Sequence, residues 1–153
     1  MTRTRTLRIG TAGWSLPREA AAAFPERGTH LQRYAAVFDA VEINSSFYRS
    51  HRRETYARWA ASVPRGFRFS VKLPREITHD LRLRACARPL RTFLGEVEGL
   101  GARLGCLLIQ LPPSLAFERA PVTRFLTLLR HRFDGNAVVE PRHATWFAPP
   151  AAG

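Results

Sequence analysis

Short apolar segments of the chain alternate with longer amphipathic ones, and this pattern predicts a fold in which strands and helices follow each other. Apolar residues recur at helical spacing in the longer segments and at every second position in most of the short ones. The expected strands cover residues 7–10, 40–44, 67–73, 104–111 and 137–140, and the expected helices cover residues 29–38, 53–63, 89–98 and 121–133. Strands that alternate with helices in this way are typical of an α/β protein with a parallel sheet.

Two architectures have this order of elements, a doubly wound open sheet and a TIM-type (β/α) barrel. A doubly wound sheet usually carries a glycine-rich phosphate loop after its first strand, and neither GxGxxG nor GxxxxGKS/T is present. A barrel instead places polar side chains on the inward face at the C-terminal ends of several strands. The expected strands follow the barrel pattern, because their outward faces are apolar. Their inward faces end on Glu42 and Asn44, Lys72, Gln110, and Glu140 with Arg142 just beyond.

These polar side chains are expected to meet at one end of the sheet, where burying them is costly unless they are paired or hydrated. Glu42 or Glu140 would be the general acid or base, because partial burial and a neighbouring like charge raise the pKa of a carboxyl group. Lys72 is the only lysine among the 24 lysine and arginine residues, and we group it with the two glutamates as a catalytic candidate. In the alternative, structural interpretation, Glu42 pairs with Lys72 and Glu140 pairs with Arg142.

Further residues around these candidates are expected to bind the substrate. Lys72 and Arg142 supply positive charge for a small polar or anionic ligand, phosphorylated or sugar-like, and Asn44 and Gln110 can orient it. The remaining binding candidates lie just after expected strands and are Gly13, Trp14, Tyr48, His79 and His143.

The histidines also raise the question of a metal. A divalent metal held by Glu42, His79, Glu140 and His143 is chemically reasonable, because carboxylate and imidazole suit several divalent ions. No spacing in the sequence requires a metal or any other cofactor. The other histidines, His30, His51 and His131, fall on expected helices or their approaches and are therefore expected at the surface.

Composition limits the class of protein. With 153 residues, of which 45% are hydrophobic, the chain can bury one core. The sequence has neither a signal-peptide pattern nor a run of about twenty apolar residues, so a cytoplasmic protein with no membrane partner is expected. The net charge of +12 leaves nucleic acid or another polyanion as an alternative partner, although the arginines are spread along the chain rather than clustered.

Five segments carry motifs that resemble a known family in their order and spacing. They are IGTAGWS at residues 9–15, VEINSSFYR at 41–49, FRFSVKLP at 67–74, LGCLLIQLPPS at 104–114 and VEPRHATWF at 139–147. Together they resemble the YecE-like family, domain of unknown function 72, over residues 8–147. The resemblance implies a TIM-type barrel with a polar cluster at the C-terminal ends of its strands, and it supplies no established reaction.

The resemblance also implies more polypeptide than five expected strands provide, because an eight-unit barrel takes about 250 residues. We therefore expect a C-terminally truncated, split or frameshifted form, with a partial barrel domain over residues 1–147 and an unstructured tail over residues 148–153. Open strand edges would favour self-association or pairing with a missing C-terminal portion. A non-functional fragment is the further alternative to an uncharacterised protein with an enzyme-type pocket.

Overall fold

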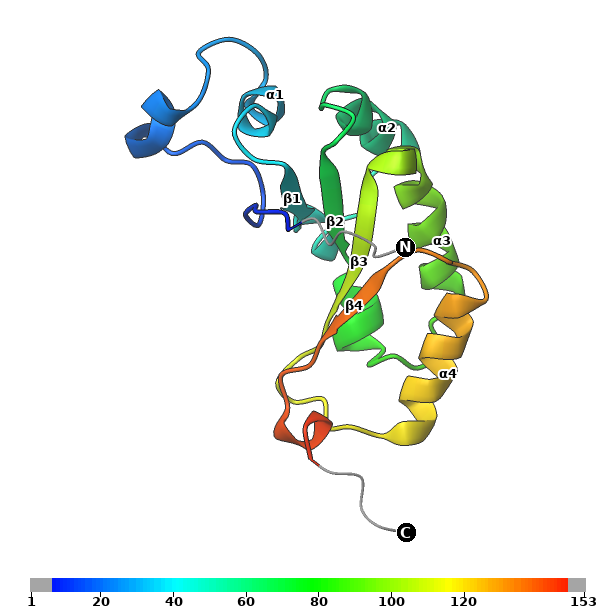
Figure 1. The fold of residues 1–153 in the computed structure, drawn as a ribbon. Helices are drawn as coiled ribbons and strands as arrows, with labels where there is room; N and C mark the ends of the chain where they lie inside the picture. The colour runs from blue at the N-terminus through cyan, green and yellow to red at the C-terminus, as the bar shows by residue number, and fades with distance from the viewer. Residues whose placement is uncertain (1–6, 149–153) are drawn as a thin grey trace, which may run out of the picture.

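A four-stranded parallel sheet forms the centre of the computed structural model, which describes residues 7–148 (Figure 1). The strands lie in the order of the sequence, β1-β2-β3-β4. Their bounds are β1 Ala40–Ile43, β2 Arg68–Lys72, β3 Leu104–Gln110 and β4 Ala137–Glu140. The predicted parallel α/β arrangement is therefore confirmed. Of the tail expected at residues 148–153, all but Ala148 lies outside the described residues.

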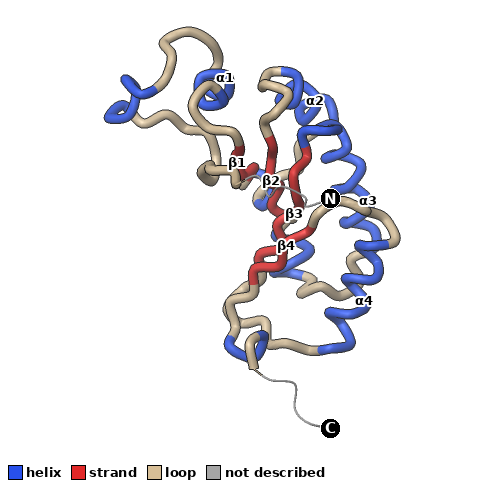
Figure 2. The backbone as a smooth tube through the Cα atoms, viewed as in Figure 1, coloured by secondary structure: helices blue, strands red, loops and turns tan. Residues whose placement is uncertain are grey.

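The helices occupy the stretches that the apolar periodicity predicted. They are α1 His30–Ala35, α2 Arg53–Ala61, α3 Ala87–Val97 and α4 Arg119–Arg130. Although α1 is only six residues long, Thr29 and Gln32 form a capping box that satisfies backbone N–H groups at its start. Helices α2, α3 and α4 all lie along one face of the sheet (Figures 1 and 2). No helix within residues 7–148 is long and apolar enough to cross a bilayer.

The two faces of the sheet differ in burial. Under the helices, Phe69 and Val71 of β2 and Leu107 and Ile109 of β3 are at most 1% exposed. On the opposite face Val138 of β4 is 49% exposed, and no described helix lies across this face of β2, β3 and β4 (Figure 2). We call this second surface the open face. Its strand residues include Glu42, Ser70, Lys72, Cys106, Leu108, Gln110, Val138 and Glu140.

The expectation of a strand at residues 7–10 is wrong. Leu7 and Ile9 are 82% and 65% exposed, so no apolar layer holds this segment in the sheet. The chain joins the sheet just afterwards, through an isolated parallel bridge between Ala12 and Glu42. Four strands and this bridge therefore replace the five expected strands within residues 7–148.

The strand register is staggered, and this decides which open-face residues are neighbours. Glu42 of β1 is level with Ser70 of β2, so Asn44, which follows β1, stands level with Lys72. Lys72 is in turn level with Leu108 of β3. Gln110, the polar residue at the end of β3, therefore lies two residues further along the strand direction, level with Glu140 of β4. The polar residues at the strand ends therefore lie at successive levels along the strand direction, and barrels also have a stagger between neighbouring strands.

Candidate functional site

Lys72 is the most buried charged side chain on the open face, with 8% of its surface exposed. Its Nζ donates a hydrogen bond to Asn44 Oδ1 at 3.1 Å and lies 4.6 Å from the centroid of the Phe47 ring. Both partners favour the ammonium group without neutralising it. Among the described residues Asn44 is the one acceptor bonded to this group, and an ammonium has three donors, so Lys72 keeps the capacity to bind an anion.

Glu42 lies one row below Lys72 on the open face and is half-buried. Burial raises the pKa of this carboxyl group above its ordinary value of 4.5, the charge of Lys72 opposes the rise, and the charge of Glu140 adds to it. The ion pair between Glu42 and Lys72, which the structural interpretation expected, is not among those formed by the described residues. Glu42 is thus a carboxyl group with a raised pKa and no ion pair among the described residues, which suits a general acid or base.

Glu140 belongs to a second group, with Gln110 and Arg142. Gln110 is level with Glu140 in the sheet and donates from Nε2 to Glu140 Oε1 at 3.1 Å. Arg142 donates to the same oxygen from Nε at 3.0 Å and from Nη2 at 2.9 Å. The structural pairing weighed for Glu140 and Arg142 is therefore present. Both side chains are almost half exposed, at 42% and 48%, so the pair contributes little stability.

A cleft with a volume of about 480 Å³ opens beside the end of β1. We call it the aromatic cleft, and its lining includes Gly13, Trp14, Asn44, Ser45, Tyr48 and Trp59. Trp14 and Trp59 meet edge to face, with ring centroids 5.1 Å apart. Gly13 has φ +79°, a left-handed conformation that favours glycine, and so turns the chain before Trp14. Asn44 lines the cleft and also binds Lys72, so it joins the cleft to the open face.

The family described as "Protein of unknown function DUF72" matches residues 8–152 of the chain. The chain belongs to the DUF72 family. The resemblance inferred from the five motifs is thereby confirmed, and the family's description names no activity.

Two curated relatives show how much of a DUF72 protein the chain represents. UPF0759 protein YecE of Escherichia coli (strain K12) is 33% identical over 141 residues, which cover 92% of this chain and 50% of the relative. UPF0759 protein YunF of Bacillus subtilis (strain 168) is 26% identical over 157 residues, with 93% and 52% covered. The chain therefore spans about half the length of the curated relatives that it matches.

Solved DUF72 structures have the same fold over this region. A crystal structure of a DUF72 family protein from Enterococcus faecalis V583 has a TM-score of 0.76 and 25% identity, covering 93% of this chain and 53% of its own. One from Thermotoga maritima MSB8 has a TM-score of 0.72 and 29% identity, covering 93% and 58%. Each solved chain thus contains further polypeptide outside the matched region.

The two histidines expected at the site of this DUF72 chain differ in their surroundings. His79 packs against the Phe47 ring, with centroids 4.9 Å apart. Its pKa is lowered, first by burial and then by the charges of Arg75, Lys72 and Arg142, while the charge of Asp80 opposes the change. Two of these cations, Lys72 and Arg142, belong to the site. His143 instead caps the following 3-10 helix, where its Nδ1 accepts a hydrogen bond from the Thr145 backbone N–H at 3.2 Å. The structure therefore supports a place near the cluster for His79 and a local structural contact for His143.

A metal site does not form from the residues weighed for it. Within residues 7–148, no group of three or more His, Cys, Asp or Glu side chains is placed to hold a metal ion. The set Glu42, His79, Glu140 and His143 is thus not gathered into one ligand sphere.

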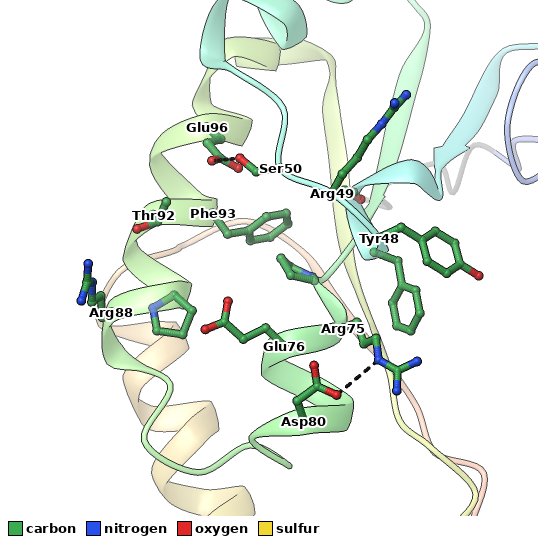
Figure 3. Close-up of a pocket in the computed structure, with 14 residues that line it drawn as sticks. Tyr48, Arg49, Ser50, Arg75, Glu76, Asp80, Arg88, Thr92, Phe93 and Glu96 are labelled. Atoms are coloured by element: carbon green, nitrogen blue, oxygen red, sulfur yellow. Dashed lines mark hydrogen bonds and ion pairs between the residues drawn. The ribbon is translucent and has the colours of Figure 1, made fainter.

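A second hollow, the outer groove, has a volume of about 570 Å³ and lies between the 3-10 helix Ser45–Phe47, the π-helix Glu76–Asp80 and α3. Figure 3 shows the Glu76 carboxylate directed into the groove and Arg75 turned toward Asp80, with Nε and Oδ1 3.2 Å apart. The lining carries arginines and carboxylates in equal number, so it favours neither sign of ligand. Of the residues expected from the sequence, Tyr48 alone lines the groove.

The structure also brings together a pair that the sequence analysis missed. His51, expected at the surface, is half-buried, and its Nε2 lies 2.8 Å from Ser45 Oγ. Both residues belong to the short connection between β1 and α2. That shared position after a strand end is the one signal in the sequence that could have pointed to them.

Proposed function

We propose that the open face lines the pocket of an enzyme that binds a small polar or anionic substrate, phosphorylated or sugar-like, at the C-terminal ends of the strands. The observation that carries the proposal is Lys72, a cation only 8% exposed that is held by a neutral amide and an aromatic ring. No carboxylate of the described residues forms an ion pair with Lys72, so no direct contact offsets the cost of burying this charge, and an anionic ligand would supply one.

The contacts of each residue indicate its role in binding or in proton transfer. Lys72 would bind the anionic group of the substrate, and Asn44, which already holds the ammonium, would fix its direction. Glu42 would act as general acid or base, because its pKa is raised by burial and no cation holds it among the described residues. Glu140 is less suited to proton transfer, since Gln110 and Arg142 already donate to one of its oxygens.

We further propose that the sheet is one side of a TIM-type β/α barrel. Four parallel strands in sequential order are half the number in such a barrel, and their polar ends lie on the face that would be inward. The relatives are about twice as long as the matched region. Polypeptide equivalent to the rest of a relative, supplied in the same chain or by association, would cover the open face and give the pocket its second wall.

A thermal-shift screen tests the binding part of the proposal. Inorganic phosphate, sugar phosphates and neutral sugars are compared at constant ionic strength, and at least one anionic compound should raise the melting temperature. Lys72→Met should weaken the affinity of the protein for this anionic compound roughly 10- to 100-fold, because a hydrogen bond to a charged group contributes about 1.5–3 kcal/mol. Arg91→Gln removes an exposed cation from α3 and serves as the control, which should bind like the wild type.

The acid/base assignment is tested with any compound that the screen identifies and the protein converts. Glu42→Gln should keep the binding and lower the turnover by roughly 10²- to 10⁴-fold, the usual contribution of general acid–base catalysis. Unchanged binding in Lys72→Met, or unchanged turnover in both Glu42→Gln and Glu140→Gln, would show that the residues are assigned wrongly.

A further inference from the structure

Ser45 and His51 form a hydroxyl–imidazole pair beside the aromatic cleft. Ser45 begins the 3-10 helix directly after β1, and its Oγ lies 2.8 Å from His51 Nε2. The imidazole ring packs edge-on against Tyr56 and Trp59 of α2, with ring centroids 5.8 Å and 5.1 Å away. Two aromatic rings therefore hold the imidazole in place with one nitrogen at the serine hydroxyl.

The surroundings favour a neutral imidazole that can accept a proton. Burial, and then the charge of Arg49, lower the pKa of His51 below its ordinary value of 6.5. Neutral histidine carries one acceptor nitrogen, and with the proton on Nδ1 this acceptor is Nε2, which faces Ser45. In this tautomer the pair has the hydrogen bond between nucleophile and base that activated serines require.

The aromatic cleft gives a ligand access to the serine. Ser45 lines the cleft together with Trp14, Trp59 and Arg49. The indole rings offer apolar surface for the organic part of a substrate, and the guanidinium offers positive charge for an oxygen that becomes negative during reaction. In a small carboxylic ester, the guanidinium would meet the carbonyl oxygen, and the indole rings would contact the acyl or the alcohol part.

We propose that Ser45 is a nucleophile toward small carboxylic esters, with His51 as its general base and Arg49 as the group that meets the negative carbonyl oxygen. This inference is independent of the proposed function, because it uses neither Glu42 nor Lys72.

The reaction has two balanced steps. In the first, Ser45 Oγ bonds to the carbonyl carbon while its proton moves to His51 Nε2, and the alcohol leaves with that proton as the carbon–oxygen bond of the ester breaks. In the second, water gives a proton to His51 and its oxygen to the acyl carbon. The bond between the acyl carbon and Ser45 Oγ then breaks, the acid leaves, and the proton on His51 Nε2 moves to Ser45 Oγ.

A fluorophosphonate reagent tests the nucleophile on the full chain, with peptide mass spectrometry as the readout. The serine oxygen bonds to phosphorus, the phosphorus–fluorine bond breaks, and fluoride leaves while His51 takes the serine proton. We expect a single adduct on the peptide that contains Ser45, no adduct there in Ser45→Ala, and a rate about 100-fold lower in His51→Gln. Ser50→Ala is the control, because that hydroxyl is bonded to Glu96 in the outer groove, and it should label like the wild type.

A second variant covers the case in which His51→Gln disturbs the fold. Ser45→Cys places a thiol at the same imidazole, and a thiol next to a base is alkylated faster because more of it is thiolate. Iodoacetamide should therefore modify the thiol introduced by Ser45→Cys faster than the half-buried Cys106 in the same molecule, a comparison that leaves His51 unchanged.

The proposal is overturned if Ser45 labels no faster than other serines, or if His51→Gln labels at the wild-type rate. A hydrogen bond that only ties the connection to α2 would give that result. Phosphate binding at Lys72 is read in the separate thermal-shift screen, so either proposal can fail without the other.

Discussion

The helix-covered face and the open face of the sheet are built from the same strands, but the first packs into the core and the second carries the polar residues of the candidate site. Val71 and Lys72 are neighbours in β2, and because side chains alternate along a strand they point to opposite faces. Val71 is fully buried in the apolar core, whereas Lys72 meets an amide oxygen and a ring face and keeps donors for a ligand. Position along the strand therefore separates the residues that stabilise the fold from those that can bind a substrate, and substitutions should affect the two separately.

The largest effect is expected on the helix-covered face. Phe69 is fully buried among the helices and the sheet, so Phe69→Ala should lower the free energy of unfolding by about 3–5 kcal/mol, through lost transfer energy and the cavity left behind. Urea denaturation measures the change. Val138→Ala on the open face is the matched control, and with Val138 49% exposed it should cost about 0.5 kcal/mol. Equal losses at the two positions would remove the distinction between the faces.

Lys72→Met should have a smaller effect on stability than Phe69→Ala, although both side chains are buried. Methionine has a similar length and keeps the contact with Phe47, and the change removes a charge from a site that is 8% exposed. We expect the free energy of unfolding to change by less than about 1.5 kcal/mol, measured by urea denaturation without ligand. A loss as large as that of Phe69→Ala would make Lys72 a structural part of the core.

Glu42→Gln on the open face should change how the stability of the protein depends on pH. Because burial raises the pKa of Glu42 in the folded chain, the unfolded chain loses this proton at lower pH, and the folded state is penalised as the pH rises above 4.5. The variant should therefore be more stable than the wild type at pH 7, by less than about 1 kcal/mol since solvent screens this half-exposed group. Thermal melts at pH 7 and pH 4 test the sign, and the difference should fade at pH 4. An advantage that grows toward pH 4 would contradict the raised pKa.

The smallest effect is expected at His79. Its lowered pKa means that below pH 6.5 the unfolded chain binds a proton that the folded chain does not, so stability should fall as the pH is lowered from 7 to 5. His79→Gln should reduce this fall by a few tenths of a kcal/mol, because the group is only partly buried. Parallel pH profiles of the wild type and the variant would contradict the lowered pKa of His79.

Much of the fold could be predicted from local pattern. Alternation and apolar runs predicted β4 at its observed bounds and β3 to within one residue. The strand expected at residues 7–10 failed for a physical reason. Leu7 and Ile9 have the right residue types, but both side chains stay mostly exposed, and apolar character alone does not form a strand.

The candidate site was only partly predictable. Alternation correctly put Asn44 and Lys72 on one face, but the row in which each polar end stands depends on the register between strands that are distant in sequence. That register cannot be read from either strand alone. The contact between Ser45 and His51 depends on the path of the turn after β1, so residue type and helical periodicity gave no sign of it.

The most direct test of the open face as a binding site uses the fact that Lys72 is the only lysine in the sequence. Lysine labelled with ¹³C and ¹⁵N gives one set of side-chain NMR signals, that of Lys72, which is followed while inorganic phosphate or a sugar phosphate is added at constant ionic strength. We predict a saturable shift of the Lys72 Cε and Nζ signals that an equal concentration of chloride does not produce. A signal that stays in place, or that moves equally with chloride, in a chain that remains folded would contradict anion binding at the open face.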